Sequence, residues 1–188
     1  MSPGGYGKTN DIEVAAFSSD RNLRRTWTFP GLFNSRSMVR LPNGELLITY
    51  EHGFVRARLG DGATGEVVQT FLQPSGRNLF EVVPDKAGTG YWAGTGYGAE
   101  LVHFTADGTA DRIWKAAQET GRRNVFYAQP QELANGHVYV CNWTGHGWND
   151  SKRGWQVLEF DGNGKVVWHL DDWEMFGSIS GIDVIESP

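Results

Sequence analysis

The chain contains very little cysteine, no long apolar run and no block of like charge. Its single cysteine among 188 residues excludes an intrachain disulfide. No stretch approaches the roughly 20 apolar residues that a membrane helix needs, and residues 1–10 are polar and show no signal-peptide pattern. The formal net charge is -5 and the basic residues are scattered, which argues against nucleic acid or a membrane as a partner.

Helical periodicity is almost absent as well. Only residues 111–120 come close, and they lack the length and the apolar period of a helix, so we interpret them as a strand that runs into a long loop. The chain is instead rich in glycine (25 residues) and tryptophan (8 residues), a composition typical of an all-β protein with many tight turns. Turn signals such as NG and DG separate short β-prone stretches. These stretches are residues 12–17, 45–50, 66–71, 100–104, 137–143, 155–160 and 165–170.

Three sequence anchors recur along the chain with one shared period. The first is a Tyr or His beside Gly, in steps of 46, 45 and 49 residues, at Tyr6, His52, Tyr97 and His146. The second is an Asp that opens a polar turn, followed seven residues later by a position that is usually Trp. These pairs are Asp20 and Trp27, Asp61 and Val68, Asp107 and Trp114, and Asp161 and Trp168. The third is LPNG at 41–44 and LANG at 133–136, two periods apart, so the chain is an internal repeat.

Each period of about 46 residues holds four short strands, which is the pattern of a β-propeller blade. We therefore predict an all-β fold, a β-propeller of four-stranded antiparallel blades, with about three complete blades and partial blades at both ends. The whole chain, 1–188, is expected to be one propeller domain or a propeller fragment. Its expected parts are a partial blade at 1–30, blades at about 36–73, 78–117 and 126–172, and a lone strand at 179–186.

The number of blades leaves three assemblies open. The ends of the chain could join into a mixed blade that closes a four-bladed ring. The chain could instead be a fragment of a longer propeller of about six to eight blades. Two chains could also pair as a homo-oligomer that completes the propeller. We favour the fragment or the paired assembly, because strand edges would otherwise be exposed at both ends.

One repeat segment resembles a known family. In FDGNGKVVW at 160–168, Asp161, Gly164 and Trp168 are similar to the tryptophan-docking repeat of quinoprotein-like β-propellers with PQQ-like repeats. The other repeats keep fewer of these positions, and one has Val68 in place of Trp. The resemblance implies a fold rather than an enzyme. We expect Trp27, Trp114 and Trp168 to lie buried at equivalent places on the fourth strand, between adjacent blades.

In a propeller of this layout, two sets of connections lie on one face around the central channel. They join the second strand to the third, and the fourth strand to the first of the next blade. Clefts with a few polar groups and exposed aromatic side chains are typical binding sites, so we predict a ligand site at this channel mouth. Its predicted residues are Tyr6, Arg36, His52, Arg77, Asn78, Tyr97, Arg123, Tyr127, Trp143, His146 and Trp148.

Two main functions remain open for this mouth. The first is a binding or scaffold module for a small molecule or carbohydrate, without a cofactor. The alternative is a lyase or hydrolase of acidic sugars, in which an arginine neutralises a carboxylate while a His and a Tyr serve as base and acid. A quinone-dependent dehydrogenase is a third option, although no cofactor-ligand set or vicinal cysteine pair is visible. No metal cage, nucleophile motif or dinucleotide fingerprint is recognisable. Localisation stays open, although the family resemblance implies a periplasmic or secreted protein.

Overall fold

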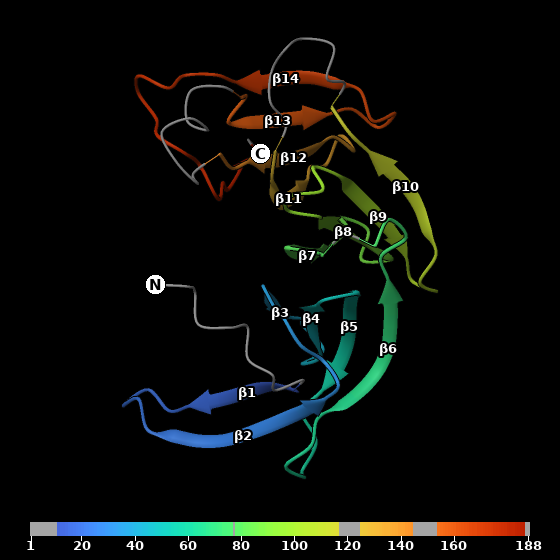
Figure 1. Cartoon of the computed structure of the whole chain (residues 1–188), viewed down its shortest axis with the longest axis vertical. Coiled ribbons are helices and arrows are strands. Elements are labelled where there is room, and N and C mark those ends of the chain that lie inside the picture. Colours follow the sequence, from blue (N-terminus) through green and yellow to red (C-terminus); the bar gives the residue numbers. More distant parts are fainter. Residues whose placement is uncertain (1–10, 77, 117–124, 145–153, 187–188) are drawn as a thin grey trace.

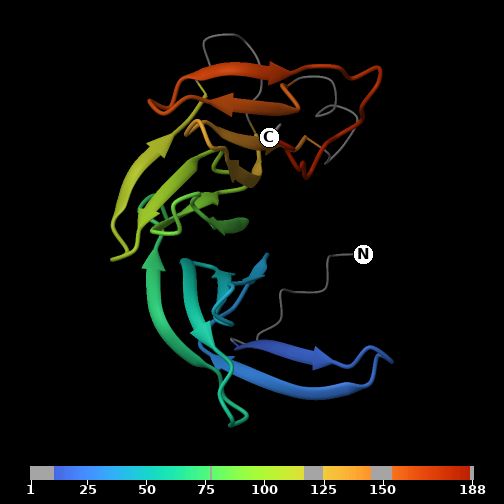
Figure 2. The same ribbon diagram turned by 180° about the vertical axis from the view of Figure 1, so that it is seen from behind.

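The computed structural model describes residues 11–76, 78–116, 125–144 and 154–186. These residues form three four-stranded antiparallel sheets and one two-stranded sheet, which confirms the predicted fold class. The sheets follow one another along an arc, from β1 and β2 at one end to β13 and β14 at the other (Figure 1). Seen from behind, the first strand of each four-stranded sheet lies on the inner side of the arc and the fourth strand on the outer side (Figure 2).

The strands of each sheet are consecutive in the sequence. The half-blade contains β1 (Asp11–Phe17) and β2 (Leu23–Pro30). Blade 1 contains β3 (Met38–Arg40), β4 (Leu46–Tyr50), β5 (Gly53–Arg58) and β6 (Glu66–Leu72). Blade 2 contains β7 (Glu81–Pro84), β8 (Gly90–Gly94), β9 (Leu101–Thr105) and β10 (Ala110–Trp114). Blade 3 contains β11 (Tyr127–Glu132), β12 (Val138–Asn142), β13 (Val157–Phe160) and β14 (Val166–Leu170).

The repeated turn motifs form the predicted hairpins. The turn between β3 and β4 and the turn between β11 and β12 each close with a glycine amide that donates to a leucine carbonyl three residues earlier. Gly44 and Gly136 have φ values of 87° and 78°, which favour glycine. The Asp-led turns cap their own backbone, since Asp107 Oδ1 accepts from the Thr109 amide at 3.0 Å and Asp161 Oδ1 accepts from the Lys165 amide at 2.9 Å.

Successive blades meet where an aromatic side chain of one blade lies on a glycine of the next. A Cβ built on Gly65 would lie 2.1 Å from the Phe29 ring, and one built on Gly164 would lie 2.4 Å from Trp114 Cδ1. Both glycines belong to the turn between the third and fourth strands. Trp27 also donates from Nε1 to the Gly60 carbonyl of blade 1 at 2.8 Å. A residue with a Cβ would clash with the ring at either position. The two glycines therefore allow the blades to approach this closely.

Three buried apolar clusters fill the space between the sheets. One joins the half-blade to blade 1, one joins blade 1 to blade 2, and one joins blade 2 to blade 3. In the middle cluster the rings of Phe54 and Phe71 stack at 4.2 Å, and Phe104 contacts Phe54 edge-on at 5.3 Å. Each blade therefore gains its core from its neighbours rather than from itself, as in other repeat proteins.

Two of the three repeated tryptophans are buried as the sequence predicts, and the third is not. Trp27 and Trp114 are each 8% exposed, beneath the following blade. The prediction for Trp168 is wrong, because this side chain is 45% exposed on β14. The physical reason is that no further sheet lies beyond β14 in the described part of the chain to cover Trp168, whose ring contacts Tyr139 of the same blade.

The predicted lone strand at 179–186 is also wrong, since no strand forms over residues 179–186. A side chain takes the place of a partner strand. The side-chain oxygen of Gln131, Oε1, accepts a hydrogen bond from the main-chain amide of Val184 at 2.8 Å, and its side-chain nitrogen, Nε2, donates to the Val184 carbonyl at 2.9 Å. Glu186 then accepts from the Ala134 amide and pairs with Lys86 at 2.7 Å. Side chains thus hold this segment in place. The pattern of β-prone residues, which predicts strand pairing, does not reveal such side-chain contacts.

Replacing Trp114 with alanine should lower the free energy of unfolding by about 3–5 kcal/mol, because truncating a buried tryptophan leaves a large cavity between two blades. The matched control is Trp168→Ala, which should cost about 1 kcal/mol or less, since exposed side chains contribute little. Urea unfolding of both variants measures the difference. Equal losses would contradict the packing described for Trp114.

Candidate functional site

Four of the predicted site residues line one pocket of about 490 Å³: Arg36, Asn78, Tyr97 and Trp143. Each comes from a different connection. Arg36 precedes β3, Asn78 lies between β6 and β7, Tyr97 lies between β8 and β9, and Trp143 follows β12. These connections are the two kinds that the sequence placed at the channel mouth. The pocket therefore depends on all three complete blades, and no single connection could form it.

An aromatic cluster forms one wall of the pocket. The buried ring of Phe126 lies at its centre and makes edge-on contacts with Phe80, Tyr97 and Trp143, at centroid distances of 4.7, 4.8 and 5.2 Å. Tyr97 is 60% exposed, so it forms the rim rather than the floor. Edge-on aromatic contacts are favourable and orient the rings. The wall is thus a preformed apolar surface with an exposed edge.

Gly96 lets the loop that carries Tyr97 reach this wall. Its φ of 55° is left-handed, and a Cβ on it would lie 3.1 Å from Phe126 Cε2. Its amide and carbonyl exchange two hydrogen bonds with Tyr127, each at 3.0 Å, which join blade 2 to the first strand of blade 3. Of the two glycines that flank Tyr97, Gly96 and not Gly98 therefore has the left-handed φ that favours glycine.

The polar side of the mouth is organised by Thr49 and Glu51 of blade 1. The buried Thr49 Oγ1 accepts hydrogen bonds from the amides of Arg36 and Ser37, at 3.0 and 2.8 Å, and so fixes the backbone that carries Arg36. The Glu51 carboxylate accepts from the side-chain amides of Asn34 and Asn78. A guanidinium, an amide and a carboxylate thus stand near an aromatic wall, which suits a ligand with both polar groups and an apolar face.

The remaining predicted residues fall into three groups. His52 is exposed and does not line the pocket, and its ring contacts Phe33 and Tyr50 edge-on. The prediction for Tyr127 is wrong, because this side chain is fully buried and its hydroxyl accepts from the Ala116 amide. Burial raises the pKa of Tyr127, which suits a core residue. Five predicted residues lie outside the described part of the chain: Tyr6, Arg77, Arg123, His146 and Trp148.

The sequence analysis missed Glu51, Phe80 and Phe126. A signal for the two phenylalanines was present, since Phe33, Phe80 and Phe126 recur at nearly the same period just before the first strand of each blade. Glu51 stands where the other repeats have Gly5, Gly96 and Gly145. The sequence therefore held a signal for both: a phenylalanine repeated before each first strand, and a glutamate at one position where the other repeats have glycine.

Two groups near the inner strands have raised pKa values without forming a reactive site. Burial, with a smaller contribution from Glu81, raises the pKa of the Cys141 thiol to about 12, so this buried thiol is a poor nucleophile. Burial raises the pKa of Glu81 as well, although this residue does not line the pocket. Within the described residues there is no cluster of three His, Cys, Asp or Glu side chains that could hold a metal, and no helix long and apolar enough to span a membrane.

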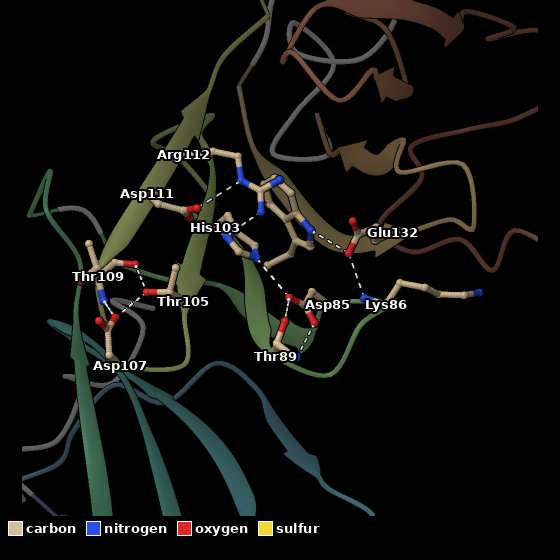
Figure 3. A network of polar contacts seen from close by, with 11 residues as sticks. Asp85, Lys86, Thr89, His103, Thr105, Asp107, Thr109, Asp111, Arg112 and Glu132 are labelled. Atoms are coloured by element: carbon tan, nitrogen blue, oxygen red, sulfur yellow. Dashed lines mark hydrogen bonds and ion pairs between the residues drawn. The ribbon is translucent and has the colours of Figure 1, made fainter.

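A second polar cluster lies in blade 2 at the opposite end of the strands (Figure 3). Its centre is His103, which is 4% exposed. His103 Nδ1 lies 2.5 Å from Asp111 Oδ1, and Nε2 lies 3.3 Å from Asp85 Oδ2. The His103 ring also lies against Trp92, and the Arg112 guanidinium lies 4.9 Å from the centre of the Trp92 ring. Both ring nitrogens of His103 have carboxylate partners, so the cluster stabilises the blade, although Arg112 Nε is buried without a hydrogen-bond partner among the described residues.

The pKa of Asp85 is lowered in this cluster. Burial alone would raise it, but hydrogen bonds from the Thr89 amide, the His103 ring and the Gly90 amide outweigh that effect. Because the folded-state pKa lies below the unfolded value, Asp85 stabilises the fold above the ordinary aspartate pKa. That contribution is lost as the pH falls through the lowered value.

Asp85→Asn should therefore destabilise the protein most at neutral pH, and the difference from wild type should shrink as the pH falls below the ordinary aspartate range. Urea unfolding at a series of pH values measures this. Thr89 also donates through its hydroxyl, so Thr89→Val is a control that should reduce stability without removing the carboxylate. A stability difference for Asp85→Asn that is independent of pH would contradict the role given to Asp85.

No family model matches the chain, and no curated protein matches it. Solved structures do. A protein of unknown function from Bacteroides caccae matches with a TM-score of 0.67 and 23% identity, over 90% of this chain and 62% of that one. Streptogramin B lyase matches with a TM-score of 0.53 and 9% identity, over 86% and 45%. The extracellular domain of BT4673 from B. thetaiotaomicron matches with a TM-score of 0.50 and 15% identity, over 92% and 22%.

These likenesses are too distant in sequence to show anything but the fold. The chain spans less than two thirds of the length of each of these structures. Together with the three four-stranded sheets, they show that the chain has the blade architecture of a β-propeller.

Proposed function

We propose that the chain is a ligand-binding β-propeller module whose mouth pocket takes a small acidic saccharide. The observation that carries this proposal is the convergence of Arg36, Asn78, Tyr97 and Trp143, from four connections, on one pocket of about 490 Å³. Residues on loops that a rigid scaffold positions commonly bind ligands. Structural packing alone would not require a cationic and an amide side chain to stand in a pocket beside an aromatic wall.

The chemistry of the pocket suits a sugar acid. The aromatic wall of Phe80, Phe126 and Trp143 can pack against the apolar C–H face of a pyranose ring. Arg36 carries planar donors that match a carboxylate bidentately. The volume of the pocket is in the range of small-molecule sites. An acidic monosaccharide therefore has a complementary partner for its apolar face, its hydroxyls and its charge.

Two finer points belong to the same proposal. The repeats are of the quinoprotein-like, PQQ-like type, which is supported by the tryptophans of β2 and β10 that pack against the third-to-fourth strand turn of the following blade. One structural neighbour is named a lyase, and the Glu51 carboxylate that contacts the pocket residue Asn78 would favour a catalytic version of the same site. Release of product from a bound uronide would decide for an enzyme over a binding module.

Binding of methyl β-D-glucuronide and methyl β-D-glucoside, followed by isothermal titration calorimetry, tests the proposal. The glucuronide should bind with a dissociation constant of about 1 mM or tighter, and more tightly than the glucoside. Trp143→Ala should weaken glucuronide binding by about tenfold or more, because it removes part of the aromatic wall. Arg36→Gln should remove the preference for the glucuronide over the glucoside, since it removes the positive charge.

The matched control is Trp168→Ala, which truncates an exposed tryptophan on β14 away from the pocket. Its glucuronide affinity should stay within about twofold of wild type. Equal effects of Trp143→Ala and Trp168→Ala, or no binding of either sugar at about 10 mM, would contradict the proposed site.

A further inference from the structure

Asn142, the last residue of β12, is a buried polar side chain that contacts the connection carrying the aromatic wall. It is 1% exposed and does not itself line the pocket. A side-chain amide is costly to bury unless both its oxygen and its nitrogen find hydrogen-bond partners. The role of Asn142 therefore follows from the groups to which it is bonded.

The side-chain oxygen of Asn142 holds the main chain of Phe126. Asn142 Oδ1 accepts hydrogen bonds from the main-chain amides of Val125 and Phe126, at 2.8 and 3.1 Å. The Phe126 carbonyl in turn accepts from the amide of Trp143, the residue that follows Asn142, at 2.9 Å. Two rings of the aromatic wall are thus carried by backbone that Asn142 either bonds or directly precedes.

The side-chain nitrogen of Asn142 ties the same point to a further connection. Asn142 Nδ2 donates to the Trp155 carbonyl at 2.8 Å, and the main-chain amide of Asn142 donates to the Gln156 carbonyl at 2.9 Å. Main-chain amides can only donate and carbonyls can only accept, so these partners permit one orientation of the side-chain amide. Asn142 therefore joins the end of β12 to the chain before β11 and to the chain before β13.

Phe126 is the ring on which the shape of the wall depends. The rings of Phe80, Tyr97 and Trp143 all contact it edge-on. A displacement of Phe126 would change all three contacts at once, whereas a displacement of Phe80 would change its one contact with Phe126. By fixing Phe126, Asn142 fixes the arrangement of the wall in the absence of a ligand.

Blade 1 places its side of the mouth by the same device. On β4, Thr49 Oγ1 accepts from the amides of Arg36 and Ser37. In both blades, a side-chain oxygen of the second strand fixes two successive amides of the connection that leads into the first strand. In blade 3, the residue placed in this way is the centre of the aromatic wall.

We infer that Asn142 is a positioning residue that sets the aromatic wall before binding, and that this wall selects a ring-shaped sugar acid over an open-chain one. A pyranose presents a rigid apolar C–H face to aromatic rings. An open-chain acid with the same charge must first be ordered to do so, which costs conformational entropy. The inference rests on the proposed function and narrows its ligand class from sugar acids to their pyranose forms.

The test compares methyl β-D-glucuronide with D-gluconate, which carry one carboxylate each but differ in ring closure. In NMR titrations of the wild-type chain, the glucuronide should bind about tenfold more tightly than gluconate or better. Asn142→Leu is close in size and lacks the oxygen, so the Phe126 amide loses its acceptor. In this variant the preference for the glucuronide should fall to about twofold or less.

A conservative variant separates positioning from general stabilisation. Asn142→Asp keeps an acceptor for the amides of Val125 and Phe126 but loses the N–H group that donates to the Trp155 carbonyl. Both variants should melt at a lower temperature than wild type, because both leave a buried carbonyl without its donor. Asn142→Asp should nevertheless keep a preference for the glucuronide of about fivefold or more. A residue that only stabilised the blade would give two variants with the same selectivity.

The matched control is Asn135→Leu, the same substitution in the turn between β11 and β12 of the same blade. Asn135 accepts from the His137 amide and does not line the pocket. Its glucuronide preference should stay within about twofold of wild type.

Amide hydrogen exchange of the wild-type chain tests the same contact without any variant. The amides of Val125 and Phe126 should exchange slowly, since they donate to a buried oxygen. Exchange as fast as that of exposed amides would overturn the hold of Asn142 on Phe126, even if Asn142→Leu does not fold.

Failure of the wild-type chain to bind methyl β-D-glucuronide would contradict the proposed function, while hydrogen exchange would still test the positioning of Phe126. Equal binding of glucuronide and gluconate by wild type would overturn the selection of the pyranose form. A folded Asn142→Leu that keeps the wild-type preference, or a folded Asn142→Asp that loses it, would overturn the role of Asn142 and leave the proposed function standing.

Discussion

The contact between an aromatic side chain and a glycine of the next blade is the constraint on which the structure depends. It is tight at two junctions, where a Cβ on Gly65 would lie 2.1 Å from Phe29 and one on Gly164 would lie 2.4 Å from Trp114. At the junction between blades 1 and 2, Phe71 lies near Gly108, where a Cβ would make an ordinary contact at 3.7 Å. In each case the aromatic side chain belongs to the last strand of one sheet, and the glycine belongs to the turn before the fourth strand of the next. A glycine at that turn allows a flat ring to lie against backbone, so it sets the spacing of the blades.

The mouth pocket inherits its geometry from this spacing. Phe126 and Trp143 come from blade 3 and its preceding connection, whereas Tyr97 comes from blade 2 and Arg36 precedes blade 1. Their mutual distances are therefore set by how the blades stack, with the Gly96 and Tyr127 backbone pair as a local tie across one junction. A site assembled from rigid neighbours in this way is preformed, which lowers the ordering cost of binding.

The sequence predicted the parts of this structure that are local. Strands, hairpins and the period follow from alternation and from turn residues such as Gly44, and the convergence of Arg36 with Tyr97 follows from topology. The failures are tertiary. Trp168 and Tyr127 differ in burial from what was expected because burial depends on which sheet covers a strand, and residues 179–186 are fixed by the Gln131 side chain. Glu51 was missed because its partners come from other connections.

The most direct test of the stacking constraint compares two glycines that share a backbone conformation. Gly164 and Gly136 have φ values of 81° and 78°, but a Cβ would meet Trp114 at Gly164 and nothing within 4 Å at Gly136. Both alanine variants carry the strain of a left-handed residue, about 1–2 kcal/mol. Urea unfolding should show Gly164→Ala less stable than Gly136→Ala by about 1 kcal/mol or more, because only Gly164→Ala forces the blades apart. Equal stability of the two variants would contradict the account.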